Sequence, residues 1–203
     1  MHILISSNFK KYFRTYIDFV DHYWISYFDR KKIKFTIIPN TKNLDLSHVT
    51  KKDVKLIILP GGNDLISKSY ISKIRLNNEI KLIKYGLKNN IPILGVCRGM
   101  QVINFFYKGK QKKIRNHMRT RHDVYFSNNF FNKPKLNVNS FHNFGIPKNL
   151  IAKSLVPIGL DKSENVEFFK HKKFKIFGVM FHPEREKKKD NLEFIIKKIL
   201  KNK

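Results

Sequence analysis

The single cysteine of the chain has the sequence neighbours of a nucleophile. Cys97 lies in the segment Gly95-Val96-Cys97-Arg98-Gly99, directly after the apolar run 91–94. A nucleophile between glycines at a strand-to-helix junction forms a nucleophile elbow, a tight turn in which larger flanking side chains would collide. The helix start that follows favours the thiolate. The alternative is a buried structural cysteine between incidental glycines, since free cysteine is often part of a core.

A histidine and a carboxylate follow a second apolar run. His182 and Glu184 stand in Phe181-His182-Pro183-Glu184, after the run 176–180. A thiol of ordinary acidity needs a base, and an imidazole can take its proton and later protonate a leaving nitrogen. The carboxylate two residues on can fix the tautomer and orientation of that imidazole. The pattern therefore favours a Cys97-His182-Glu184 triad over a surface histidine beside a proline turn.

A pair of glycines ends a third apolar run. The segment Pro60-Gly61-Gly62-Asn63-Asp64 follows the run 54–59. Glycines at a strand end let backbone N–H groups turn toward a ligand, and we expect the N–H groups of Gly62 and Arg98 to receive an oxyanion. Taken alone, a Gly-Gly pair is more often an ordinary turn.

Apolar runs and helical patterns alternate through the first half of the chain. We expect strands at 3–5, 35–38, 54–59 and 91–96, and helices at 16–28, 71–87 and 101–107. Continuous apolar strands separated by helices indicate a parallel sheet covered on both faces. Beyond residue 108 we expect short strands at 124–126, 136–138, 151–156, 166–169 and 175–180, and a last helix from about residue 190. The length suits one domain over 1–203.

Composition narrows the class of protein. The chain has 42 Lys and Arg against 15 Asp and Glu, a formal charge of +27. Such a charge attracts nucleic acid, but the lysines are scattered, as in Lys112-Lys113 and Lys172-Lys173, and the lysine-, asparagine- and isoleucine-rich composition is typical of AT-rich codons. We therefore expect no nucleic-acid partner, while the charge favours an anionic small substrate. A lone cysteine forms no internal disulfide, and no apolar run is long enough for a membrane span or a signal-peptide core, so we expect a cytoplasmic protein.

The three motifs together resemble one family. Pro-Gly-Gly, then Gly-Val-Cys-Arg-Gly-Met-Gln, then Phe-His-Pro-Glu resemble the class I glutamine amidotransferases, in family order and over nearly the whole chain. The resemblance implies a flavodoxin-like three-layer α/β sandwich, with a central mostly parallel sheet and added short antiparallel strands. Within the family, Gly-Asn-Asp and Cys-Arg-Gly-Met-Gln look like the free-standing γ-glutamyl hydrolases of the peptidase C26 group. The implied reaction passes through a γ-glutamyl thioester on Cys97 and needs no metal and no organic cofactor.

The resemblance also implies substrate-binding residues. Those of the γ-glutamyl pocket would be Gly61, Gln101, Ser140, Phe141 and His142. Gly-Gly-Asn-Asp-Leu, Asn-Ser-Phe-His-Asn and His-Pro-Glu-Arg-Glu are similar to hydrolases that split γ-glutamyl-CDP-amidate into glutamate and cytidine diphosphoramidate, in the synthesis of the phosphoramidate modification of capsules. Candidates for meeting the diphosphate of such a substrate are Arg115, His117, Arg119 and Arg121.

Other functions stay open at the level of sequence. One is a glutaminase subunit that delivers ammonia to a synthase partner, and another is a γ-glutamyl-γ-aminobutyrate-type hydrolase. A third is a non-enzymatic binding module that uses the positive charge. Met180 stands where many relatives have Gln, and the chain is shorter than typical aminobutyrate hydrolases, which reduces the loops that shape specificity. The sequence determines neither the leaving group nor the oligomeric state.

Overall fold

A computed structural model describes residues 1–47, 49, 52–65, 69–127, 130–186 and 190–201. Within these residues one sheet has nine strands, in the order β4-β1-β5-β6-β13-β12-β11-β8-β9. The parallel half consists of β4 (Lys34–Ile38), β1 (His2–Ser6), β5 (Val54–Leu59), β6 (Ile93–Val96) and β13 (Ile176–Val179). Four of these strands are almost entirely buried, as the continuous apolar runs predict.

The other half of the sheet is antiparallel. It consists of β12 (Val166–His171), β11 (Leu155–Leu160), β8 (Met118–Phe126) and β9 (Lys135–Phe141). Two short pairs lie outside the main sheet: β2 (Asn8–Tyr12) with β3 (Thr15–Phe19), and β7 (Lys112–Lys113) with β10 (Phe144–Gly145). The expected combination of a parallel centre with added antiparallel strands is confirmed.

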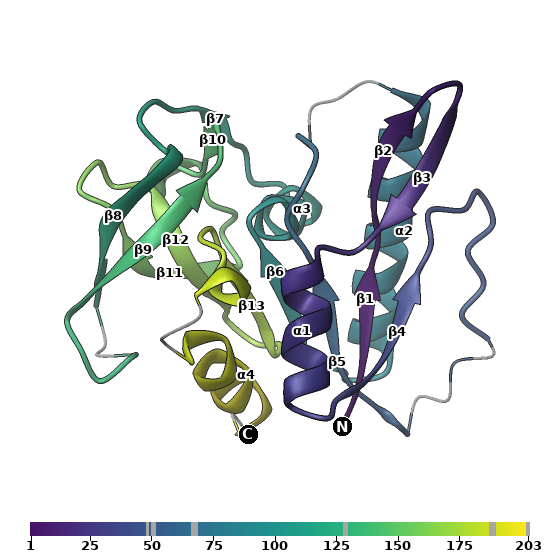
Figure 1. Ribbon diagram of the computed structural model, residues 1–203. Helices are drawn as coiled ribbons and strands as arrows, with labels where there is room; N and C mark the ends of the chain where they lie inside the picture. Colours follow the sequence, from purple (N-terminus) through teal and green to yellow (C-terminus); the bar gives the residue numbers. More distant parts are fainter. Residues whose placement is uncertain (48, 50–51, 66–68, 128–129, 187–189, 202–203) are drawn as a thin grey trace.

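Helices cover both faces of the parallel half (Figure 1). On one face α1 (His22–Arg30) and α4 (Asn191–Lys201) pack through Trp24, Phe28 and Ile195 onto the side chains of β1, β5 and β6. On the other face α2 (Tyr70–Lys88) and α3 (Arg98–Phe106) bury Leu82 and Ile103. The two 3-10 turns are Lys148–Leu150 and Pro183–Arg185. The three layers of the expected sandwich are therefore present.

The helix predicted at 16–28 is wrong in its first part. Residues Thr15–Phe19 form β3 of a hairpin, and the helix α1 begins only at His22. Asp21 ends the extended segment and caps the helix, because its carboxylate accepts a hydrogen bond from the N–H of Tyr23 at 3.1 Å. The hairpin continues directly from β1 and extends beyond the carboxyl end of that strand (Figure 1).

Smaller differences concern the bounds of other elements. The strand predicted at 151–156 begins at Leu155, because a 3-10 turn at Lys148–Leu150 and a turn after Ala152 precede it. The helix predicted from residue 101 begins at Arg98, directly after the elbow. No described helix is long and apolar enough to cross a membrane.

Candidate active site

Three adjacent parallel strands bring the three motifs to one edge of the sheet. In the strand order, β6 lies between β5 and β13, with Leu59 paired to Gly95 and Val179 paired to Val96. The chain therefore leaves all three strands at the same level, into the glycine pair, the cysteine elbow and the His-Pro-Glu segment. Open α/β sheets place their sites at this carboxyl edge.

The elbow has the strained geometry expected of a nucleophile turn. Cys97 has φ 50° and ψ −105°, a conformation that side-chain-bearing residues rarely adopt. Its N–H donates to the carbonyl of Val179 at 2.7 Å, which anchors the turn to β13. A Cβ on Gly95 would lie 2.6 Å from the backbone of Gly99, and a Cβ on Gly99 would lie 1.9 Å from the carbonyl oxygen of Leu59, so neither position of the elbow tolerates a larger side chain. The prediction that the two glycines serve the turn is consistent with this packing.

The imidazole of His182 faces both the thiol and the carboxylate. Its Nδ1 donates to Glu184 Oε1 at 2.6 Å, and its ring forms a hydrogen bond with the thiol of Cys97. A Cβ added to Gly61 would lie 2.5 Å from His182 Cε1 and 3.3 Å from Cys97 Cβ, so the two side chains meet beside this glycine. All three side chains of the predicted triad are nearly buried, which strengthens electrostatic interactions among them.

The surroundings of His182 favour its charged form. Burial by itself lowers the pKa of this imidazole, but the charges of Glu184 and Cys97 and its hydrogen bonds with both raise the pKa to about 10. The backbone of His182 is also held in place, since Asn139 receives a hydrogen bond from its N–H and donates one to its carbonyl, both at 2.8 Å. At neutral pH the arrangement therefore holds an imidazolium next to the sulfur of Cys97.

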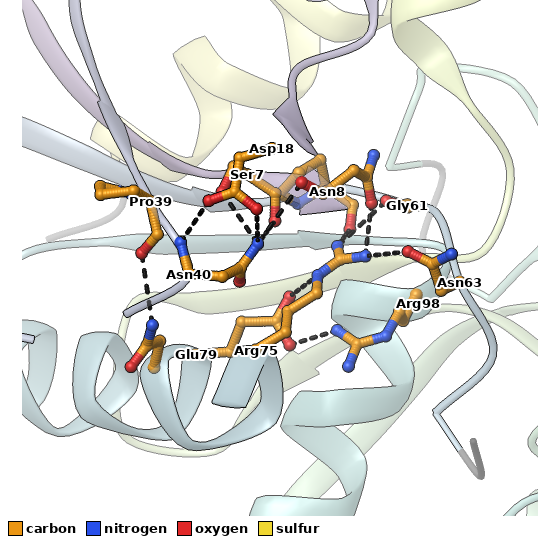
Figure 2. A network of polar contacts seen from close by, with 12 residues as sticks. Ser7, Asn8, Asp18, Pro39, Asn40, Gly61, Asn63, Arg75, Glu79 and Arg98 are labelled. Atoms are coloured by element: carbon orange, nitrogen blue, oxygen red, sulfur yellow. Dashed lines mark hydrogen bonds and ion pairs between the residues drawn. The ribbon is translucent and has the colours of Figure 1, made fainter. Parts of the chain in front are cut away.

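A buried ionic network lies beneath the glycine pair (Figure 2). The guanidinium of Arg75 donates to the carbonyls of Pro60 and Gly61, both at 3.2 Å, and to the side chain of Asn63 at 3.3 Å. It also donates to the side chain of Asn8, at the base of the hairpin. Because both carbonyls of the turn are engaged by Arg75, their peptide planes are fixed. Gly62, at φ 133°, completes the turn.

The same network reaches the elbow through Glu79. This carboxylate accepts from Arg75 Nε at 3.1 Å and from the guanidinium of Arg98, the residue that follows the nucleophile. Burial and the charge of Arg98 lower the pKa of Arg75, and Glu79 opposes that shift. All three side chains are at most 2% exposed. Two cations share one anion, so the network carries a net positive charge beside Cys97.

Sequence reasoning missed Arg75 and Glu79. Their spacing of four residues is that of an ordinary surface ion pair on a helix, and nothing local indicates that both are buried. The one feature of the sequence that could have indicated their burial is their position in a helical segment otherwise expected to bury apolar residues. Arg98 was predicted only for its backbone N–H, which stays a prediction, while its side chain links the elbow to α2.

The residues expected to line the γ-glutamyl pocket have different surroundings. Gln101 is buried one turn into α3 and donates to the carbonyl of Phe144 at 3.0 Å. The ring of Phe141 contacts that of His182 edge-on, with centroids 5.8 Å apart, and the guanidinium of Arg185 covers it. Ser140 is buried, and its hydroxyl donates to the carbonyl of His117 at 2.6 Å. Gly61 and Phe141 therefore lie against the triad, and their roles toward a substrate stay predictions.

The other predicted residues lie along β8, in the loop before it and, for His142, directly after β9. The exposed side chains of Arg115 and Arg119 form no ion pair with any described residue, whereas Arg121 is paired with Glu186 at 2.8 Å. His117 and His142 belong to a separate cluster of imidazoles around Glu167. The structure thus places the two histidines around Glu167 and leaves Arg115 and Arg119 on the surface.

The fold is that of known amidotransferases. A Thermoplasma acidophilum protein described as a GMP synthase subunit superposes with a TM-score of 0.73 at 22% identity, over 98% of this chain and 92% of that chain. A glutamine amidotransferase from Thermotoga maritima gives a TM-score of 0.67 at 18% identity, over 90% of this chain and 76% of that chain. At these identities the likeness defines the class of fold, a class I amidotransferase-like α/β sandwich.

The sequence itself assigns the family. Residues 16–202 match the family model for glutamine amidotransferase class-I, and the chain belongs to this family. It is 38% identical, over 85% of its length and 83% of the relative's, to a γ-glutamyl-CDP-amidate hydrolase of Campylobacter jejuni. It is 33% identical, over 73% of each chain, to the glutamine-hydrolysing GMP synthase subunit of Methanocaldococcus jannaschii. The predicted class of enzyme, a hydrolase acting on a γ-glutamyl amide, is thereby confirmed.

Proposed function

We propose that the chain hydrolyses γ-glutamyl-CDP-amidate to glutamate and cytidine diphosphoramidate, with Cys97 as nucleophile, His182 as acid and base, and Glu184 as orienting carboxylate. The observation that carries the proposal is the meeting of thiol, imidazole and carboxylate beside Gly61 at the carboxyl edge of the sheet. The 38% identity to a hydrolase of that substrate supports the choice of leaving group.

The first half of the reaction is acyl transfer to sulfur. The thiolate of Cys97 attacks the γ-carbonyl carbon, and the carbonyl oxygen takes up the negative charge of a tetrahedral intermediate. Backbone N–H groups of Gly62 and Arg98 receive this oxyanion, in a turn whose carbonyls are already engaged by Arg75. The C–N bond then breaks, and the imidazolium of His182 gives its proton to the departing nitrogen. A γ-glutamyl thioester remains on Cys97.

The second half returns the enzyme to its starting state. His182, now neutral, takes a proton from water, and the resulting hydroxide attacks the thioester carbonyl. The C–S bond breaks, glutamate leaves, and Cys97 is again a thiolate beside an imidazolium. Glu184 keeps Nδ1 protonated throughout, so that Nε2 is the nitrogen that exchanges protons.

The surface beside the site supports an anionic leaving group. Arg119 follows Met118, which pairs with Phe141 across β8 and β9, and the ring of Phe141 contacts that of His182. Arg119 and Arg115 are exposed and have no carboxylate partner among the described residues. A planar guanidinium suits diphosphate oxygens. The charge of +27 adds a long-range attraction for such a substrate.

A panel of amides tests the substrate. We expect the purified chain, without any partner, to release glutamate from γ-glutamyl-CDP-amidate with a higher kcat/KM than from γ-glutamyl-γ-aminobutyrate or glutamine. Added salt should lower kcat/KM for the diphosphate substrate and leave that for glutamine nearly unchanged, because only the former is drawn by charge. Equal salt sensitivity of both substrates would count against charge-based recognition.

A second function is favoured by the likeness to the glutamine-hydrolysing GMP synthase subunit. A glutaminase of this kind would prefer glutamine and would gain activity when a synthase partner is added. Robust turnover of γ-glutamyl-CDP-amidate by the chain alone dismisses this alternative. Preference for glutamine with activation by a partner would instead overturn the proposed leaving group, while leaving the thiol chemistry intact.

The protonation state of His182 gives a test that needs no substrate. Its pKa is raised from 6.5 to about 10, so the ring stays charged between these pH values, where an ordinary histidine is neutral. We expect NMR titration of the ring of His182 to show an imidazolium at pH 8. Cys97→Ala removes one of the stabilising charges and should lower this pKa, and Glu184→Gln should lower it as well. A ring that is neutral at pH 7 in the parent chain would contradict the ion pair.

A further inference from the structure

A second cluster of titratable side chains lies in the antiparallel half of the sheet. His122 comes from β8, His142 directly follows β9, and Glu167 comes from β12, next to His117, which precedes β8. The rings of His117 and His122 have centroids 4.7 Å apart, and those of His117 and His142 are 5.1 Å apart. Ligand atoms of His117, His122 and Glu167 all lie within 4.8 Å of one another. The proposed acyl transfer uses none of these side chains.

The polar atoms of this cluster are buried without partners. Glu167 is fully buried, yet neither of its carboxylate oxygens accepts a hydrogen bond from any described residue. Both ring nitrogens of His122 and Nε2 of His142 are likewise without a hydrogen-bond partner among those residues. A carboxylate taken out of water is costly unless a cation or donors compensate it. Glu167 is therefore a buried anion that no hydrogen bond from the described residues compensates, and a bound cation would stabilise it.

The tautomer of His142 adds a second hydrogen-bond acceptor to this buried cluster. Its Nδ1 donates to the carbonyl of Phe144 at 3.0 Å, so the proton of the neutral ring is on Nδ1 and the lone pair is on Nε2. Nε2 faces Glu167 Oε1 at 3.7 Å, and His142 is only 3% exposed. Two acceptors thus face each other inside the protein, an arrangement that a bound cation between them stabilises.

The distance between Glu167 and His122 fits two ligands of one metal ion. Glu167 lies 3.5 Å from His122 Nε2 and 3.7 Å from His142 Nε2, too far for good hydrogen bonds. With metal–ligand bonds of about 2.0–2.1 Å, neighbouring ligand atoms of a tetrahedral zinc ion lie about 3.3 Å apart. We propose that His117, His122 and Glu167, whose ligand atoms lie within 4.8 Å of one another, bind a zinc ion, with His142 as the neighbouring ring.

His117 and the surrounding pocket define how the site is completed. The ring of His117 contacts Asp161 at 2.9 Å and the carbonyl of Arg115 at 2.7 Å, so it joins the ion by exchanging one of these contacts. A pocket of about 400 Å³, lined by His117 and His122 among others, leads from the solvent to the cluster. The ion ties β8 to β12, and the ring of His142, which follows β9, packs against that of His117. Strand β9 also carries Asn139, which holds the backbone of His182. The role of the ion is structural.

Metal analysis of the whole chain tests the proposal. The measurement uses the Cys97→Ser chain without a polyhistidine tag, so that neither the active-site thiol nor a tag binds zinc. We expect one equivalent of zinc by elemental analysis after growth with added zinc, and a rise in Tm when zinc is returned to chelator-treated protein. X-ray absorption at the zinc edge should show imidazole ligands. A chelator-treated chain that neither takes up zinc nor gains in Tm would overturn the proposal.

Variants assign the ion to this cluster. Glu167→Gln and His122→Asn should each weaken zinc binding by at least about 10- to 100-fold. Loss of a residue that only hydrogen-bonds to a metal ligand already weakens metal binding by about this factor, and loss of a ligand itself should weaken it more. The matched control is His22→Asn, an exposed histidine of α1, which should bind zinc like the parent. Zinc that survives Glu167→Gln but is lost in His182→Ala would belong to the triad and would also overturn the proposal. If a variant fails to fold, the X-ray absorption spectrum of the Cys97→Ser chain still tests the site, because a spectrum without imidazole ligands would contradict it.

Discussion

Replacing Cys97 with alanine is expected to lower kcat/KM for γ-glutamyl amides by roughly 10⁴-fold or more, because no other group can form the thioester. The folded structure should survive. The substitution removes one sulfur atom, and alanine has the same difficulty as cysteine in adopting φ 50°, so the strain of the elbow is unchanged. The measurement is the rate of glutamate release at substrate concentrations well below KM, which gives kcat/KM, together with urea unfolding of both chains.

Cys97→Ser is the matched control for this experiment. Serine keeps a nucleophilic atom and the hydrogen-bonding capacity of the position, but its hydroxyl is far less acidic than a thiol and forms no stable ion pair with His182. We expect it to be nearly as inactive as the alanine variant and equally stable. Turnover of the alanine chain at a rate near that of the parent would remove Cys97 from the mechanism, since the described fold offers no second thiol.

Replacing Glu79 with glutamine is expected to lower the free energy of unfolding by about 3–5 kcal/mol, because it leaves two buried guanidinium groups without their shared anion. Arg75 and Arg98 are at most 2% exposed and both contact this carboxylate. The measurement is urea unfolding at neutral pH. The matched control is Glu164→Gln, which breaks a pair with Lys148 on the surface, where 70% of the Glu164 side chain is exposed. That change should cost less than about 1 kcal/mol.

The same substitution should also impair catalysis at temperatures where the variant is still folded. Arg75 holds the carbonyls of Pro60 and Gly61, and Arg98 follows the nucleophile, so a disturbed network moves both sides of the expected oxyanion site. We expect kcat to fall with little change in KM, as for a group that acts in the transition state. If Glu79→Gln raises KM and leaves kcat unchanged, Glu79 does not position the site. The same conclusion follows if its free energy of unfolding falls by no more than that of Glu164→Gln.

The sequence by itself determined the parallel strands of the main sheet, the three motifs and the family. Cys97, His182 and the glycine pair each end an apolar strand, and parallel strands present their carboxyl ends at one edge. Because a local pattern fixes both the strand and the residue that follows it, the meeting of these groups was predictable without coordinates. The helices α2 and α4 were predictable for the same reason, since each buries apolar side chains at helical spacing.

Only the tertiary structure decided what lies between these elements. Ile17 fits a helical pattern with Trp24, yet residues 15–19 pair with β2, and Asp18 accepts hydrogen bonds from the backbone and side chain of Asn40. Arg75 and Glu79 have the spacing of an exposed pair, yet both are buried under the glycine turn. His122, His142 and Glu167 meet only because β8, β9 and β12 fold together. In each case the deciding partner is distant in the sequence, so no local periodicity or spacing can indicate it.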